Sequence, residues 1–154
     1  MHHNLRKPLR HVIITGGAGF IGSQISARLL KEKTRVTILT RNVSAPRATV
    51  LAQQGCKVVA CDLADAHRIP RPDTLDPADA LFHFAADVSV SSPTLRAANV
   101  DGTSRALALA DALAIPYVVY ASSIEAQGLG SDQEIPLREG LFQPLFIDDL
   151  VEGL

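Results

Sequence analysis

Thr15-Gly16-Gly17-Ala18-Gly19-Phe20-Ile21-Gly22 is the stretch that decides the fold. It follows a short apolar run, His11–Thr15, and opens a segment, Phe20–Lys31, in which apolar residues recur at helical spacing. Glycine lets a tight turn leave the strand at Gly16, lets the backbone approach a pyrophosphate at Gly19, and lets the helix pack closely on the strand at Gly22. The N-terminus of such a helix attracts an anion through its free N–H groups and its dipole. A glycine turn between a strand and a helix therefore predicts a dinucleotide site, with glycines kept for packing alone as the alternative.

The rest of the chain up to Ala121 alternates between strand-like and helix-like segments. Strands are expected at His11–Thr15, Arg35–Thr40, Lys57–Cys61, Ala80–Ala85 and Tyr117–Ala121, and helices at Phe20–Lys31, Ala45–Gln54 and Pro93–Ala114. The stretch Ala64–Asp79 contains three prolines and is expected to be mostly loop. Strands that alternate with helices predict a parallel sheet covered on both faces. The expected fold class is α/β, a Rossmann-type doubly wound parallel sheet in three αβα layers. It would comprise a lead-in at 1–10, the dinucleotide-binding domain at 11–128, and a final segment at 129–154.

Composition excludes several classes of function. The chain has 154 residues, 47% of them hydrophobic and 20% charged, which suits one domain with a sizeable core. Its net charge of −1 gives no reason to expect a nucleic acid or an anionic membrane as a partner. Two cysteines, Cys56 and Cys61, are too few for a metal site and are placed poorly for a disulfide, so a reducing cytoplasm is the expected location.

Five segments, in this order along the chain, resemble the extended short-chain dehydrogenase/reductase family, also called the NAD-dependent epimerase/dehydratase family. They are Thr15–Gly22, Asp62-Leu63, His83-Phe84-Ala85-Ala86, Asn99-Val100-Asp101-Gly102-Thr103, and Tyr120-Ala121-Ser122-Ser123 followed by Gly128. The resemblance implies NAD or NADP as the cofactor and a small-molecule substrate such as a nucleotide sugar. It implies hydride transfer to or from a carbonyl or alcohol group in the complete protein.

The resemblance also implies roles for individual residues. The glycine turn, including Phe20 and Ile21, would hold the cofactor, Asp62 and Leu63 would lie at the adenine, and the backbone of Phe84, Ala85 and Ala86 would line the ribose. Asn99 interrupts a good helix, which suggests that its side chain makes hydrogen bonds. Ser123 matches the family's catalytic serine or threonine. His83 is expected to be a core histidine, and Asp87 could meet the substrate or face solvent.

The choice between NADP and NAD depends on the residues after the second expected strand. An acidic residue there would accept hydrogen bonds from the ribose 2′-hydroxyl of NAD. This chain has Thr40-Arg41-Asn42 instead, and Arg41 could pair with the 2′-phosphate of NADP. The sequence therefore favours NADP, with a solvated Arg41 as the alternative.

The resemblance breaks down after Ser123. The family's chemistry needs a Tyr-x-x-x-Lys pair on a later helix, but the only tyrosines here are Tyr117 and Tyr120, and no lysine follows Lys57. The end of the chain, Pro144–Leu154, resembles a segment that lies much later in the family, as though about a hundred residues were absent before it. Three explanations of this gap are a stretch missing from the sequence, a deletion in the gene, and a fragment.

Two functions other than an enzyme stay open. One is a catalytically inactive dinucleotide-binding module, and the other is a fold kept for partner contacts alone. Because family members often dimerise through two helices of which this chain has one, dimerisation stays open.

Overall fold

The computed structural model describes residues 8–89 and 91–121. The chain divides into two units, Met1–Tyr120 and Ala121–Leu154, and almost all of the described residues belong to the first. Ser123, Gly128 and the expected final segment lie outside the described residues, as does most of the expected lead-in.

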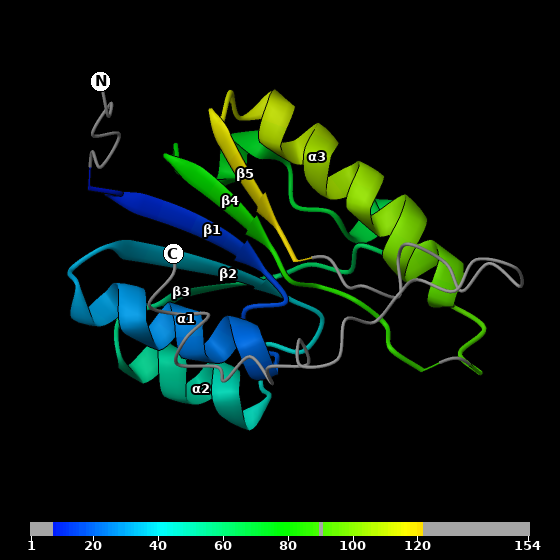
Figure 1. Cartoon of the computed structure of the whole chain (residues 1–154), viewed down its shortest axis with the longest axis horizontal. Coiled ribbons are helices and arrows are strands. Elements are labelled where there is room, and N and C mark those ends of the chain that lie inside the picture. Colours follow the sequence, from blue (N-terminus) through cyan, green and yellow to red (C-terminus); the bar gives the residue numbers. More distant parts are fainter. Residues whose placement is uncertain (1–7, 90, 122–154) are drawn as a thin grey trace, which may run out of the picture. The chain divides into compact units, whose positions relative to one another are not determined.

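Five parallel strands form one sheet in the order β3-β2-β1-β4-β5 (Figure 1). They are β1 His11–Thr15, β2 Arg35–Thr40, β3 Lys57–Ala60, β4 Ala80–His83 and β5 Tyr117–Tyr120. All five expected strands are confirmed, although β3, β4 and β5 end one or two residues earlier than expected. The central strand β1 pairs with β2 on one side and β4 on the other, so that Ile13 lies opposite both Thr37 and Leu81. The polypeptide therefore reverses its direction of winding beside β1.

In the described part of the chain, three α-helices connect the strands: α1 Phe20–Lys31, α2 Pro46–Gln53 and α3 Gly102–Ala112. The α1 bounds match the expectation, and α2 begins with a proline at its first turn, where a missing N–H costs nothing. A π-helical turn, Ala97–Asp101, precedes α3, so regular helix starts later than the expected Pro93. The reason is local, because the Ser92 and Thr94 side chains bind the Asp87 carboxylate and hold this stretch in a turn. None of the helices in the described part is long and apolar enough to cross a membrane.

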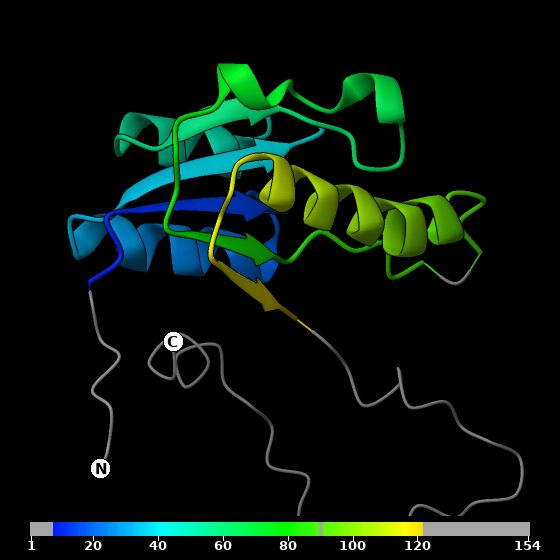
Figure 2. The ribbon, with the colours of Figure 1, turned by 90° about the horizontal axis from the view of Figure 1, so that it is seen from above.

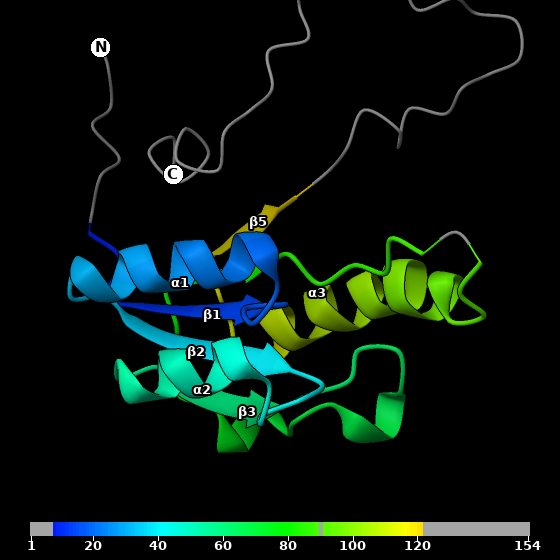
Figure 3. The ribbon, with the colours of Figure 1, turned by 90° about the horizontal axis from the view of Figure 1, so that it is seen from below.

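Side chains from alternate positions of the strands fill two apolar layers, one on each face of the sheet. On one face Ile13, Leu39 and Leu81 pack with Ala106 and Leu109 of α3 in a single core cluster. The residues between them point to the other face, which α1 and α2 cover. Figure 1 shows α1 and α2 side by side, Figure 2 shows α3 running along β4, and Figure 3 shows β3 and β5 at the two sides of the sheet. The expected three-layer α/β fold is confirmed.

Candidate functional site

A cavity of about 310 Å³ opens where β1, β2, β3 and β4 end. In parallel sheets ligands bind beyond the carboxyl ends of the strands, at the point where the strand order reverses. This cavity lies at that point, because its walls come from the segments that follow the four strands. Eight of the residues predicted from the sequence line it: Gly16, Gly19, Arg41, Asp62, Leu63, Phe84, Ala85 and Ala86.

The glycine turn forms one wall of the cavity through very close backbone contacts. Gly16 has a φ of +68°, and a Cβ on it would lie 2.6 Å from the backbone nitrogen of Ala85. A Cβ on Gly22 would lie 2.3 Å from the carbonyl oxygen of Gly16. The Gly19 N–H donates to that same oxygen at 2.8 Å. Side chains are therefore excluded at Gly16 and Gly22 by backbone atoms, which explains the glycines at both positions.

The N-terminus of α1 faces the turn without a capping side chain. Gly19 is its N-cap residue and has no side chain to cap it, and the first turn carries no acidic residue. Phe20, Ile21 and Gly22 form this first turn and do not line the cavity, and the Phe20 side chain is 63% exposed. The expected cofactor contact of these three residues stays a prediction, and it would be made by backbone N–H groups rather than by side chains. An uncapped helix terminus of this kind favours an anionic ligand group.

Arg41 brings positive charge to the cavity from the end of β2. Its side chain is exposed, and among the described residues it forms no ion pair within 4 Å. The neighbouring Asn42 accepts the Ser44 N–H at 3.0 Å and so shapes the loop. No carboxylate lies between Thr40 and Ser44 to repel a phosphate group.

Hydrogen bonds and an ion pair hold the segment after β3, which forms another wall of the cavity. One Asp62 carboxylate oxygen accepts the Ala64 N–H at 3.1 Å, and the other lies 3.5 Å from an Arg68 nitrogen. The Arg105 guanidinium of α3 donates to the Leu63 carbonyl at 2.5 Å. Burial raises the pKa of the Cys61 thiol to about 11, with the Asp62 charge adding to the effect, so this part of the wall carries a neutral thiol at neutral pH.

Asp87 lines the cavity from the loop after β4. Its carboxylate accepts hydrogen bonds from the Ser92 hydroxyl at 2.5 Å and the Ser89 N–H at 3.0 Å. The Ser92 bond is the main cause that holds the Asp87 pKa below its usual value, and the Arg41 charge contributes least. Asp87 is partly buried at the cavity wall, and a contact of Asp87 with the substrate stays a prediction.

Asn99 does not line the cavity but fixes the Asp87 loop. Its side-chain oxygen accepts the Asp87 N–H at 2.7 Å, and its side-chain nitrogen donates to the Asp87 carbonyl at 2.8 Å. Asn99 lies in the π-helical turn, and such turns are frequent at functional sites. The hydrogen-bonding role expected for its side chain is therefore served within the protein.

We expect Asn99→Ala to lower the free energy of unfolding by about 1–3 kcal/mol, because it leaves both polar groups of the Asp87 backbone without their partner. Urea denaturation followed by circular dichroism would measure this. Asn42→Ala removes one exposed hydrogen bond and is the control, with an expected loss below about 1 kcal/mol. Equal losses in the two variants would contradict the special role of Asn99.

The remaining lining residues include Ala18, Asn42, Ala45, Ala64 and Ala98, which were not singled out from the sequence. Four of these five stand next to a residue predicted for the site, so extending each predicted set by one position would have found them, and Ala45 has no such neighbour. His83 is 2% exposed and hydrogen-bonded, which confirms it as a core histidine. Within the described ranges no three His, Cys, Asp or Glu side chains gather as they would around a metal ion.

A parallel sheet with a glycine turn, an uncapped helix and a cavity at the strand reversal defines a nucleotide-binding protein of the Rossmann class. The chain belongs to the NAD-dependent epimerase/dehydratase family, whose model matches residues 12–146. The resemblance seen in the sequence is therefore confirmed.

Several proteins that the chain resembles are named as epimerases or dehydratases of nucleotide sugars. A probable UDP-arabinose 4-epimerase from Oryza sativa subsp. japonica is 32% identical over an alignment that covers 84% of this chain and 33% of that protein. The dTDP-D-glucose 4,6-dehydratase of Homo sapiens is 27% identical over 81% of this chain and 39% of its own length. A crystal structure of UDP-glucose 4-epimerase from Stenotrophomonas maltophila with bound NAD and formylated UDP-arabinopyranose is 25% identical, with a TM-score of 0.66 over 83% of this chain and 40% of that one. The chain spans about a third of the length of the curated relatives it matches.

Proposed function

We propose that this chain binds a nicotinamide dinucleotide in the cavity beyond β1, β2 and β4, and that it prefers NADP to NAD. The observation that carries the proposal is the glycine turn, where backbone atoms of Gly16 approach Ala85 so closely that a Cβ would overlap them. This bare backbone lies beside the uncapped N-terminus of α1 and at the cavity wall. Such a cradle suits a pyrophosphate, whose oxygens accept hydrogen bonds from backbone N–H groups.

Each predicted residue has a place in this binding mode. Gly16, Gly19 and the first-turn N–H groups of Phe20 and Ile21 would face the pyrophosphate, and Gly22 would let α1 pack onto the turn. The other wall residues would contact further parts of the dinucleotide: Asp62 and Leu63 the adenine, the backbone of Phe84, Ala85 and Ala86 the cofactor ribose, and Arg41 the 2′-phosphate. Asn99 would act through the Asp87 loop.

For the complete protein we infer hydride transfer on a nucleotide sugar or a similar carbonyl or alcohol substrate, supported by the epimerases and dehydratases among its relatives. The bound dinucleotide would supply the hydride chemistry, and Ser123 would hydrogen-bond the reacting oxygen. The second candidate is a binding module without turnover, favoured by the missing Tyr-x-x-x-Lys pair in the sequence. We also propose that residues 11–128 form the dinucleotide-binding domain. A cytoplasmic location is proposed because the two cysteines are unpaired.

Fluorescence titration of the purified chain with NADPH and NADH tests the proposal. We expect both to bind and the Kd for NADPH to be lower by about tenfold, because a charge-assisted hydrogen bond to the 2′-phosphate contributes about 1.5–3 kcal/mol. ATP at the same concentrations is the control for binding of phosphate groups in general. Absence of binding by both dinucleotides would overturn the proposal and favour a fold kept for partner contacts.

A further inference from the structure

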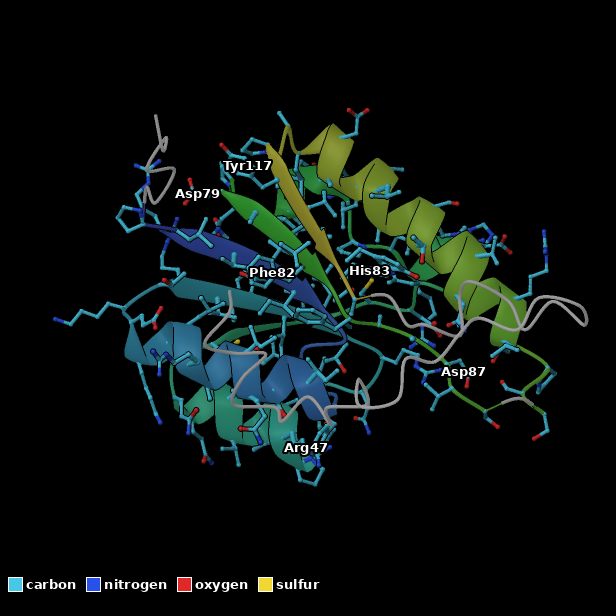
Figure 4. The ribbon with its side chains drawn as sticks, in the orientation of Figure 1. Arg47, Asp79, Phe82, His83, Asp87 and Tyr117 are labelled. Carbon is cyan, nitrogen blue, oxygen red and sulfur yellow. The ribbon has the colours of Figure 1, made fainter. Side chains whose placement is uncertain are left out.

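A buried histidine links three elements of the fold directly behind the cavity. His83 ends β4 (Figure 4). The residue is 2% exposed. Its Nδ1 lies 2.6 Å from the Thr15 hydroxyl oxygen of β1, and its Nε2 lies 3.0 Å from the Thr103 hydroxyl oxygen of α3. The Tyr120 ring of β5 stacks on it with centroids 5.6 Å apart.

The direction of each hydrogen bond follows from the neighbouring partners. The Thr103 hydroxyl donates to the Asn99 carbonyl at 2.7 Å, so its oxygen must accept a proton from His83 Nε2. A neutral imidazole carries one proton, so Nδ1 must accept the proton of the Thr15 hydroxyl. The Thr15 oxygen in turn accepts the Ala85 N–H at 3.4 Å. We thus assign the Nε2–H tautomer to His83 on the basis of its partners.

Both ends of this chain of hydrogen bonds reach the cavity wall. At one end the Ala85 N–H bonds to Thr15, and Ala85 lines the cavity next to Gly16. At the other end Asn99 holds the backbone of Asp87, which also lines the cavity. The imidazole therefore fixes β4 relative to α3 between two segments of one wall.

We propose that neutral His83 is a positioning residue for the dinucleotide, holding the Ala85 and Asp87 segments of the cavity wall at the spacing the ligand needs. This inference rests on the proposed function. It adds a second requirement for tight binding of the dinucleotide, beside the glycine turn. The His83 ring, which does not line the cavity, must stay uncharged.

Protonation would break this arrangement in a defined way. A doubly protonated ring donates at both nitrogens, so the Thr15 hydroxyl would have to turn its own proton away from Nδ1. Among the described residues, the groups in contact with the ring are two hydroxyls and a phenol ring, from β1, α3 and β5, and none of these is a carboxylate that would favour the charged form. Burial lowers the His83 pKa below its usual value, which keeps the ring neutral at neutral pH. As the pH falls below the unfolded value of about 6.5, the folded form begins to lose stability. The wall loses its fixed spacing as the pH falls through the lower pKa of His83 in the folded form.

The test measures the Kd for NADH from about pH 5.5 to 8 in the wild type and in His83→Gln, which keeps a donor towards Thr103 but does not titrate. NADH is used because the 2′-phosphate of NADPH has a second pKa of about 6 and would itself titrate in this range. We expect the wild-type Kd to rise in acid and the His83→Gln Kd to stay constant. We expect His83→Leu to weaken binding by about tenfold at neutral pH, because both anchors are lost. An unchanged acid limb in His83→Gln, or an undiminished affinity in His83→Leu, would overturn the proposal.

A second buried histidine provides the matched control. His11 is 3% exposed and also uses both ring nitrogens, with Nδ1 2.7 Å from the Pro77 carbonyl and Nε2 2.9 Å from the Thr37 hydroxyl oxygen. It begins β1 and therefore lies at the end of the strand away from the cavity. His11→Leu is expected to lower stability as His83→Leu does and to leave the Kd unchanged. If both variants changed the Kd equally, His83 would stabilise the fold without positioning the cavity wall.

Nitrogen-15 NMR of the uniformly labelled protein separates failure of this inference from failure of the proposed function. We expect the Nε2–H tautomer at His83 and a protonated Nδ1 at His11, because a carbonyl can only accept. On acidification the amide signals of Ala85 and Asp87 should move in the wild type and stay in His83→Gln. If neither dinucleotide binds, the proposed function and the cofactor part of this inference both fail, and the NMR signals still decide whether His83 couples the two wall segments. An Nδ1–H tautomer at His83 would overturn the coupling itself.

Discussion

Gly16→Ala is expected to lower the free energy of unfolding by about 2–6 kcal/mol and to reduce the affinity for NADPH by about 100-fold or more. Two costs combine. A residue with a side chain at a φ of +68° costs about 1–3 kcal/mol, and overpacking a closely packed site typically costs about 1–3 kcal/mol more. The added Cβ would meet the backbone of Phe84 and Ala85 within 2.8 Å, and backbone cannot rotate away as a side chain can. The turn must therefore move away from the cavity wall, which removes the pyrophosphate cradle.

Gly55→Ala is the matched control for this prediction. Gly55 also has a positive φ, of +98°, but a Cβ there would have no atom within 4 Å. It should show only the conformational cost of about 1–3 kcal/mol, with an unchanged Kd for NADPH. Urea denaturation and fluorescence titration of both variants measure the two effects. If Gly16→Ala and Gly55→Ala were equal in stability and in affinity, the contact with Ala85 would have no role.

Arg41→Asp is expected to raise the Kd for NADPH by about 100-fold and the Kd for NADH by less than about threefold. The variant removes a charge-assisted hydrogen bond and places a carboxylate beside the 2′-phosphate, together about 3 kcal/mol. With NADH the new carboxylate meets a 2′-hydroxyl, from which it can accept a hydrogen bond. The preference between the cofactors should therefore reverse.

Arg35→Asp makes the same change of charge at the opposite end of β2. Arg35 is exposed and does not line the cavity, so its replacement should leave both Kd values within about twofold, because charges separated by more than a Debye length are screened in salt. Titrations with both cofactors at fixed ionic strength give the four ratios. If NADPH and NADH respond equally to Arg41→Asp, Arg41 is a solvated loop residue and the preference for NADP is lost.

The first half of the sheet could be predicted from the sequence almost residue by residue. The bounds of β1, α1 and β2 match the expectation because apolar periodicity and a glycine turn are local signals that the fold does not override. The start of α3 differs because the side chains of Ser92 and Thr94 bind Asp87, a contact that helical spacing does not reveal.

Part of the site could be predicted because it too depends on local sequence signals. The residues that were predicted and that line the cavity follow the ends of strands, where short sequence motifs identify them. The hydrogen bonds that hold the wall were not predictable, because His83 joins Thr15 and Thr103 from distant parts of the chain. Ser123 lies outside the described residues, so its catalytic role stays a prediction.

The position of β1 has a consequence for how the chain acquires its structure. β1 is synthesised first and lies at the centre of a sheet in which all four pairings are parallel. Val12 pairs with Val36 on one side and with Ala80 on the other, and both partners are distant in the sequence. Because these pairings are parallel, no short hairpin brings the partners together early. Large loops must close before β1 is covered, which slows folding in proteins dominated by non-local contacts. Until then the fully apolar run Val12-Ile13-Ile14 stays open to other chains, so the yield of soluble protein should depend on how quickly β4 reaches β1.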